Sequence, residues 1–343
     1  MQWVDLLLTL ACCIAVLLLP RVSEAKTHVF KIAPEQAYNG MLESTIPPVL
    51  TIDDGDTVVF NTVMLLEGKL TADMTVRDLI ALRKDIQERG NGSYAFTGPF
   101  YVNGAEPGDT LEIRIKSIVP GDWGVSYIYP DEMKIGGLPE GFREGWFKTL
   151  RYSSDKKTAE FEPGIVVKLR PFLGTMALAP RPGEKRPPAV PDYFAGNMDN
   201  KELIAGTTLF VPVNVPGGLF LAADAHGCQG DGEVCITASE TWFESVELEF
   251  VVRKNLKLER PMAETPTHWI VMGFHADLNE AMKIALRDSI EFLMTHKKLS
   301  REEAYVLCSL AVDFRVTQIV DGNKGIHGMI PKEIFVKETS DMA

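Results

Sequence analysis

The most constraining feature of the chain is a strict alternation of polar and apolar residues in two separate stretches. Residues 110–116 read TLEIRIK and residues 245–250 read SVELEF. Because successive side chains of a β-strand point to opposite faces, each stretch predicts a strand with one buried and one solvated side. From Lys26 to about Val252 the pattern favours β structure. Further β-rich runs follow glycine turns at Gly55-Asp56-Thr57, Gly108-Asp109-Thr110 and Gly206-Thr207-Thr208.

The period becomes helical after Pro266. Asp277-x-x-Glu280 is a capping-box pattern, and Ser300-x-x-Glu303 predicts a second helix to about Ala311, followed by a strand over 314–320. We therefore predict a mainly β fold, a β-sandwich body with an α+β C-terminal portion. The residues expected on the buried face of the first helix are Leu278, Ala281, Met282, Ala285, Leu286, Ile290 and Leu293.

Proline and charge concentrate in residues 180–192, PRPGEKRPPAVPD, which predicts an exposed connection. It divides the chain into an N-terminal β-rich lobe, 26–180, and a second lobe, 193–343, that holds the active-site β segment and the α+β portion. The same ranges also suit one continuous domain.

The first 25 residues resemble a targeting segment. An apolar run over 6–19 is shorter than the ~20 residues that a spanning helix needs. Ser23 and Ala25 then occupy the −3 and −1 positions of a signal-peptidase site, although Asp5 precedes the run and no Lys or Arg does. We predict a cleaved signal peptide, a mature start at Lys26, a secreted or periplasmic protein and no stable membrane anchor. An uncleaved anchor is the alternative.

The formal net charge is −12, and no basic block lies along the chain. Nucleic acid and anionic membrane surfaces are therefore excluded as partners. The absence of GxGxxG, P-loop and GxSxG patterns removes the main support for nucleotide-binding and serine-hydrolase functions.

Polar residues crowd into residues 221–235, LAADAHGCQGDGEVC. Asp224 and His226 are two apart, so both point to one face at the end of a strand and can share a cation. Asp199 lies in an upstream turn that a hairpin through residues 209–213 would bring close. These three residues predict a divalent-metal site, best suited to Zn²⁺. Glu233 is the candidate general base.

Each of these residues also has an ordinary interpretation. D-x-H is a common spacing, Asp199 and Asp231 suit turns, and Glu233 suits a solvated strand. Cys228 offers a different chemistry, as a nucleophile with His226 as its base. A free reactive thiol fits an oxidising compartment poorly, and a disulfide between Cys228 and Cys235 is the alternative.

Several longer motifs resemble the acetamidase/formamidase family of metal-dependent linear-amide hydrolases, over about Pro47 to Phe335. The most specific are GN-x-D at 196–199 and D-x-H-x-x-QGDGE at 224–233. The others are PPVLTIDDGDTV (47–58), TGPFYVNGAEPGDTLEIRI (97–115), GDWG (121–124), PFLGTMALAP (171–180), NKELIAGTTLFVPVNVPGGLF (200–220) and IPKEIF (330–335).

The resemblance implies a mainly β sandwich, a homodimer, and hydrolysis of formamide- or acetamide-like substrates to ammonia and a carboxylate through a metal-activated water. The family's metal and active-site residues fall on Asn197, Asp199, Asp224, His226, Gln229 and Glu233. In this interpretation Gln229 and Asn197 orient the small amide substrate or stabilise its oxyanion.

The chain departs from the family at Ala223, at Tyr94 and at residues 41–44 (MLES), and Cys228 replaces a small residue. These departures leave the identity of the amide open. They also allow an alternative function, a secreted β-sandwich binding protein that has lost catalysis.

Overall fold

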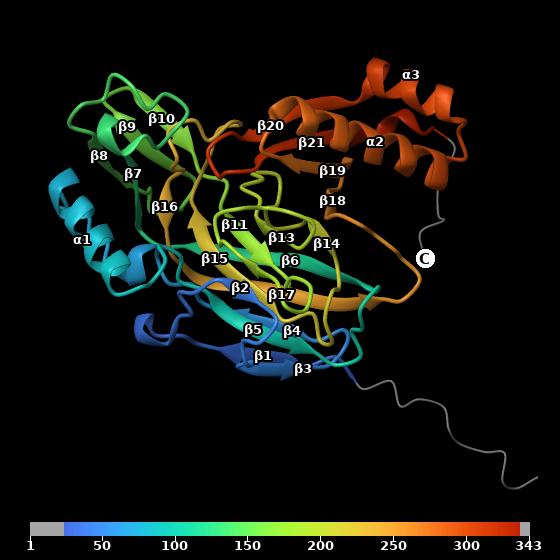
Figure 1. Ribbon diagram of the computed structural model, residues 1–343, viewed down its shortest axis with the longest axis horizontal. Helices are drawn as coiled ribbons and strands as arrows, with labels where there is room; N and C mark the ends of the chain where they lie inside the picture. The colour runs from blue at the N-terminus through green and yellow to red at the C-terminus, as the bar shows by residue number, and fades with distance from the viewer. Residues whose placement is uncertain (1–23, 337–343) are drawn as a thin grey trace, which may run out of the picture.

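The computed structural model describes residues 24–336 and contains two large β-sheets (Figure 1). The nine-stranded sheet contains, in order, β1 (Thr27–Phe30), β4 (Thr57–Phe60), β17 (Phe243–Arg253), β6 (Thr110–Pro120), β14 (Thr208–Pro212), β18 (Met262–Glu264), β19 (His268–His275), β21 (Lys324–Pro331) and β20 (Asp313–Gln318). The eight-stranded sheet contains β13 (Ala195–Asn197), β11 (Phe172–Ala177), β15 (Phe220–His226), β16 (Glu240–Thr241), β7 (Trp123–Ile128) and β8 (Trp146–Arg151), with β5 (Thr97–Val102) and β3 (Leu50–Ile52) attached through β15.

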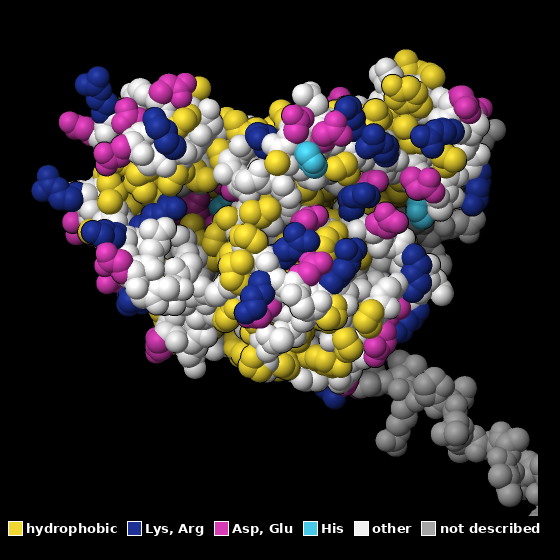
Figure 2. All heavy atoms as spheres, in the orientation of Figure 1, with side chains coloured by type: hydrophobic (Ala, Val, Ile, Leu, Met, Phe, Trp, Pro, Cys, Tyr) yellow, Lys and Arg dark blue, Asp and Glu magenta, His cyan; other side chains and the backbone are white. Residues whose placement is uncertain are grey.

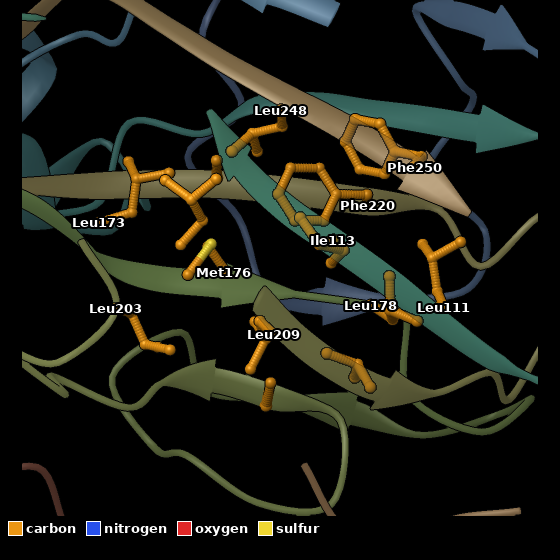
Figure 3. Close-up of a cluster of buried hydrophobic side chains, with 14 of the residues drawn as sticks. Leu111, Ile113, Leu173, Met176, Leu178, Leu203, Leu209, Phe220, Leu248 and Phe250 are labelled. Atoms are coloured by element: carbon orange, nitrogen blue, oxygen red, sulfur yellow. The ribbon is translucent and has the colours of Figure 1, made fainter. Parts of the chain in front are cut away.

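The main hydrophobic core lies between these sheets. Figure 3 shows side chains from both sheets pointing toward one another: Leu111, Ile113, Leu248 and Phe250 from β6 and β17, and Leu173, Met176 and Phe220 from β11 and β15. Fully burying each such side chain stabilises the fold by ~1.5–3 kcal/mol. This arrangement confirms the predicted β-sandwich body.

The three glycine turns begin strands of the nine-stranded sheet, as predicted. Gly55, Gly108 and Gly206 have φ values of 88°, 89° and 90°, which a side chain would disfavour. In the first two turns the following aspartate accepts a backbone N–H from three residues upstream, at 2.9 Å in both cases. The aspartates therefore fix the turns that start β4 and β6.

Two of the three helices in the described residues are those the sequence predicted. α2 (Leu278–Lys297) has Asp277 as its N-cap, and α3 (Arg301–Ala311) begins with the complete Ser300/Glu303 capping box. Helix α2 packs on β19 and β21, so the C-terminal portion extends the nine-stranded sheet. The predicted face packs against the sheet, but to different depths. Buried residues are Ala281, Ala285, Ile290 and Leu293, whereas Leu278, Met282 and Leu286 are only partly buried.

Helix α1 (Val76–Glu88) was not predicted. It begins with a capping box in which Thr75 and Asp78 cap one another, a pattern visible in the sequence as Thr75-x-x-Asp78. Figure 1 places α1 at the opposite side of the molecule from α2 and α3. Short 3-10 turns lie at Pro34–Gln36, Leu66–Gly68, Asp131–Met133 and Lys332–Ile334.

The connection over residues 180–192 is less exposed than predicted, with five of its thirteen residues exposed, and it contains β12 (Lys185–Arg186), which pairs with β2 (Leu42–Glu43). A second ribbon joins β9 (Thr158–Glu162) to β10 (Ile165–Lys168). Both large sheets mix strands from before and after this connection, and the division into lobes stays a prediction.

Residues 1–23 of the predicted signal peptide lie outside the described residues, and no described helix is long and apolar enough to cross a membrane.

Candidate active site

Three neighbouring strands bring the predicted site residues together. β11 lies between β13 and β15, so Asp199, just after β13, comes close to Asp224 and His226 on β15. The expected hairpin through residues 209–213 is wrong, because β14 belongs to the other sheet. Asp199 nevertheless lies close to Asp224 and His226, because only β11 separates the strands that carry them and the side chains share one face of the sheet.

His226 is the centre of the cluster and is almost completely buried. Its Nε2 lies 3.3 Å from a carboxylate oxygen of Asp224 and 3.3 Å from one of Glu240, while Nδ1 lies 3.6 Å from Asp199. Its ring and that of Phe172 form an edge-to-face pair, with 5.1 Å between ring centroids. The imidazole is therefore held between carboxylates on both of its nitrogens.

The orientation of His226 follows from Gln229. The Gln229 amide nitrogen donates to the backbone carbonyl of Asp199 at 2.8 Å, so its carbonyl oxygen must be the atom that faces His226 Nδ1 at 3.1 Å. Because that oxygen can only accept, Nδ1 donates. The Nε2 lone pair is then the one free to bind a cation, on the side of Asp224 and Glu240.

Ligand-type atoms in the described residues form two groups that share His226. One group contains Asp224 and Glu240, the other Asp199 and Glu233, and in each the atoms lie within 4.8 Å of one another. Buried oxygens of Asp199, Glu233 and Glu240 lack hydrogen-bond partners. Carboxylate oxygens with an imidazole nitrogen are donors that suit Zn²⁺, and unpartnered buried oxygens need a cation or protons. The residues therefore fit a divalent metal.

Gly174 of β11 leaves the space in which these groups meet. A Cβ at this position would lie 2.4 Å from Asp199 Oδ1, 2.7 Å from Asp224 Oδ2 and 2.9 Å from His226 Cε1. Such distances are far below van der Waals contact. Glycine is therefore required here for the close approach of the two carboxylates, not for its backbone freedom.

Three of the acidic residues have positive φ angles, 49° for Asp199, 62° for Asp224 and 43° for Glu233. This left-handed conformation costs a non-glycine residue of the order of 1–3 kcal/mol. Strain of this kind persists where surrounding packing imposes it, and it gathers at functional sites. Here it aims three carboxylates at one histidine.

The cluster is strongly acidic and poorly solvated. Burial raises the pKa of Asp199 to about 6 and that of Glu240 to about 7, and the nearby Asp224 carboxylate adds to both shifts. Burial also raises the pKa values of Glu233 and Asp321 well above their usual range. For His226, burial would lower the pKa, but Glu240 and Asp224 outweigh it and raise it. Protons therefore occupy the site that a cation would otherwise hold.

The sequence did not identify Glu240 and Asp321. Glu240 lies on β16 directly opposite His226, and Asp321 lies between β20 and β21, in the turn Val320-Asp321-Gly322. A lone glutamate in a Ser-Glu-Thr stretch and an aspartate in a hairpin turn carry no distinctive signal. Only strand pairing reveals them.

Asn197 and Cys228 have surroundings that bear on their predicted roles. The Asn197 amide nitrogen donates to Asp199 Oδ2 at 2.6 Å, and its oxygen accepts from the Thr175 hydroxyl. Cys228 packs with Leu150 in a separate apolar cluster, and burial raises the pKa of its thiol. The cysteines at 228, 235 and 308 are all free, so the alternative disulfide is absent.

A cavity of about 450 Å³ opens onto the cluster. Asn197, Asp224, His226, Glu233, Glu240 and Asp321 line it, and Asp199 does not. Figure 2 shows a hollow beside α1 with acidic and histidine side chains deep inside and a basic side chain at its edge. A solvent-accessible cavity ending on buried acid and imidazole groups is the usual form of a hydrolytic site.

Known proteins share this architecture. The acetamidase of Bacillus halodurans superimposes with a TM-score of 0.80 at 29% identity, covering 90% of this chain and 99% of that one. The acetamidase of Yersinia enterocolitica gives a TM-score of 0.81 at 26% identity, covering 92% and 95%. A Schizosaccharomyces pombe protein provisionally named a formamidase is 26% identical over 274 residues, which span 63% of this chain and just under two thirds, 65%, of that relative.

Fold and site thus define a protein of the class of amide hydrolases that act on carbon–nitrogen bonds. The profile of the acetamidase/formamidase family matches residues 30–183 and 187–337. The chain belongs to the acetamidase/formamidase family, which confirms the resemblance seen in the sequence.

Proposed function

We propose that this protein hydrolyses the C–N bond of linear amides to ammonia and a carboxylate, using a divalent cation for which Zn²⁺ is the best match. The observation that carries the proposal is the buried His226, set among carboxylates where a cavity of about 450 Å³ ends. An amide carbonyl is a weak electrophile and neutral water a weak nucleophile, so both need activation.

In this proposal His226 Nε2, Asp224 and Glu240 hold the cation. Glu240 takes the place that Asp199 had in the set predicted from the sequence, because Asp199 lies on the Nδ1 side, outside the cavity lining. A bound divalent cation supplies Lewis acidity to the amide oxygen and to water. Asp199 lies 3.6 Å from His226 Nδ1, on the other side of the ring from the cation, and its carboxylate balances positive charge on the imidazole.

Glu233 is the proposed general base. It lines the cavity, and burial and the nearby Asp199 carboxylate raise the pKa of its carboxyl, which makes the ionised carboxylate a stronger base. Water adds to the amide carbon as its proton passes to Glu233. The same proton then goes to the nitrogen, so that ammonia leaves as the C–N bond breaks.

Gln229 and Asn197 act on other site residues in this proposal. Both ends of the Gln229 amide are engaged, by His226 and by the Asp199 carbonyl, so it fixes the imidazole. Asn197 holds Asp199 and has one amide hydrogen left for a substrate oxygen. Of the two, only Asn197 lines the cavity.

Ammonia release from formamide, acetamide and longer amides tests the function. We expect activity that a chelator removes and Zn²⁺ restores. His226→Ala loses both metal and turnover, whereas Glu233→Gln keeps the metal and loses ~10²–10⁴-fold in turnover. A binding protein without catalysis, the alternative function, would release no ammonia from any amide in the presence of metal.

We also propose secretion with a mature start at Lys26. The backbone nitrogen of Lys26 lies 2.7 Å from Asp56 Oδ1, and His28 occupies the other oxygen of this buried carboxylate at 2.7 Å. Cleavage after Ala25 would turn that nitrogen into an ammonium already placed beside an anion. N-terminal sequencing of the exported protein tests this start, and retention of Met1 would contradict it.

A further inference from the structure

The cavity is much larger than a formamide or acetamide molecule. Sites of roughly 300–1,000 Å³ are those that enclose drug-sized ligands, and this one measures about 450 Å³. Beyond the acidic cluster its walls are aromatic and aliphatic, with Tyr127, Tyr129, Leu65, Ile135 and Ile236 among the lining residues. A substrate that fills it has an acyl part extending well past the amide.

Two cationic residues, Arg83 and Lys134, also line the cavity. Arg83 comes from α1, and its guanidinium lies over the Tyr129 ring, 4.7 Å from the ring centre. Lys134 is exposed, which places it at the open end. The cavity therefore has carboxyl groups around His226 and two cationic side chains elsewhere in its lining.

Arg83 is unusual because its charge is not paired. Within residues 24–336 it makes no ion pair, and its buried Nε has no hydrogen-bond partner. By contrast Arg89, at the C-terminal end of the same helix, donates hydrogen bonds to Glu67 and Asp85. Because its Nε is buried without a polar partner, the place of this guanidinium in the cavity suits an incoming anion with which it forms a bidentate pair.

We infer that the substrate is an amide that carries an anionic group at the far end of its acyl chain, bound by Arg83 with Lys134. This inference rests on the proposed function. The charge distribution also fixes the orientation of the substrate. Its anionic end pairs with Arg83 and Lys134, which leaves the neutral amide end to reach His226.

The experiment compares pairs of amides: the monoamides of succinic, glutaric and adipic acid against unbranched neutral amides of the same chain length. Ammonia release gives kcat and KM for each. We expect the wild-type protein to prefer at least one anionic amide, mainly through a lower KM. Arg83→Gln should reduce that preference by ~10–100-fold, the scale of one lost charged hydrogen-bonding partner.

Two further variants separate recognition from packing. Arg83→Lys keeps the charge and should retain much of the preference. Lys84→Gln alters an exposed cation on the same helix, one that pairs with Glu88 at 3.7 Å, and should leave the preference unchanged.

Equal use of charged and neutral amides by the wild-type protein would overturn the inference and leave the proposed function standing. An Arg83→Gln variant that slows both kinds of amide equally would assign Arg83 to packing on Tyr129, and also overturns it. Release of ammonia from none of the amides would overturn the proposed function and the inference together.

Discussion

Single atoms decide whether the carboxylates can meet at His226. The absent Cβ of Gly174 is the clearest case, since an alanine methyl would lie 2.4 Å from Asp199 Oδ1 and 2.7 Å from Asp224 Oδ2. Gly230, in the loop after β15, has open space around it and no positive φ. These two glycines form a matched pair.

Gly174→Ala should therefore lose the zinc proposed for this site and most activity, whereas Gly230→Ala should keep both. The physical reason is that the methyl group displaces the carboxylates from the imidazole without removing any proposed ligand. Metal analysis of the purified variants, with circular dichroism to confirm folding, measures the effect. Full zinc occupancy in Gly174→Ala would show that the cation lies elsewhere.

Cys228 gives a second prediction at the scale of one residue. Its thiol packs in an apolar cluster with Leu150 and is absent from the lining of the active-site cavity, so it is not placed to attack a substrate. Cys228→Ser should keep turnover within a few-fold of wild type. A loss of ~10³-fold with normal zinc content would instead support the cysteine mechanism.

At the scale of elements, the end of α1 is tied to the turn before it by one carboxylate. Glu67 accepts hydrogen bonds from Arg89 at 2.8 and 2.9 Å, from Lys69 at 2.6 Å and from Asn91 at 2.8 Å. The Arg89 guanidinium, with Lys69 and Asn91, lowers the pKa of Glu67 to about 2. This contact holds the helix that carries Arg83.

Because the folded-state pKa of Glu67 is below its unfolded value, its contribution to stability is full above about pH 4.5 and is lost as pH falls toward 2. Glu67→Gln should cost on the order of a few kcal/mol at pH 7 and little near pH 2. Urea unfolding across this range measures it, with the exposed Glu88→Gln as control. A cost that does not change with pH would contradict the ion-pair origin.

The packing of α2 on β19 and β21 depends on which residues of its apolar face are enclosed. Leu293→Ala should cost ~2–5 kcal/mol, since that side chain is fully buried. Leu286→Ala should cost clearly less, because Leu286 is only partly covered. Denaturant unfolding of the two variants compares them directly, and equal costs would mean that Leu286 is covered in solution, by a partner subunit.

At the scale of the whole molecule, the apolar residues left on α3 bear on assembly. Tyr305, Val306 and Leu310 are 57%, 56% and 78% exposed, and Figure 2 shows hydrophobic side chains gathered over this corner. We propose that the protein is a homodimer and that this surface takes part in the contact.

Leu310→Glu should then shift the molecular mass measured by light scattering from dimer toward monomer, because a buried carboxylate opposes association. The control is Val29→Glu. Val29 is also exposed, but it lies on β1, at the edge of the nine-stranded sheet opposite β20. A wild-type monomer at high concentration would rule out the dimer. An unchanged dimer in Leu310→Glu would move the interface to another surface.

The sequence by itself determined the mainly β class, several of the strands, the glycine turns and both C-terminal helices, because period, caps and turn residues act over a few neighbouring positions. It also identified Asp199, Asp224, His226 and Glu233 as one group, through motifs close together in the chain. Tertiary structure alone decided the rest. Glu240 and Asp321 join the site through strand pairing, Gly174 through a close approach between strands, and Arg83 through the docking of α1 over Tyr129. Contacts between distant segments depend on register and packing, which no local pattern of residues encodes.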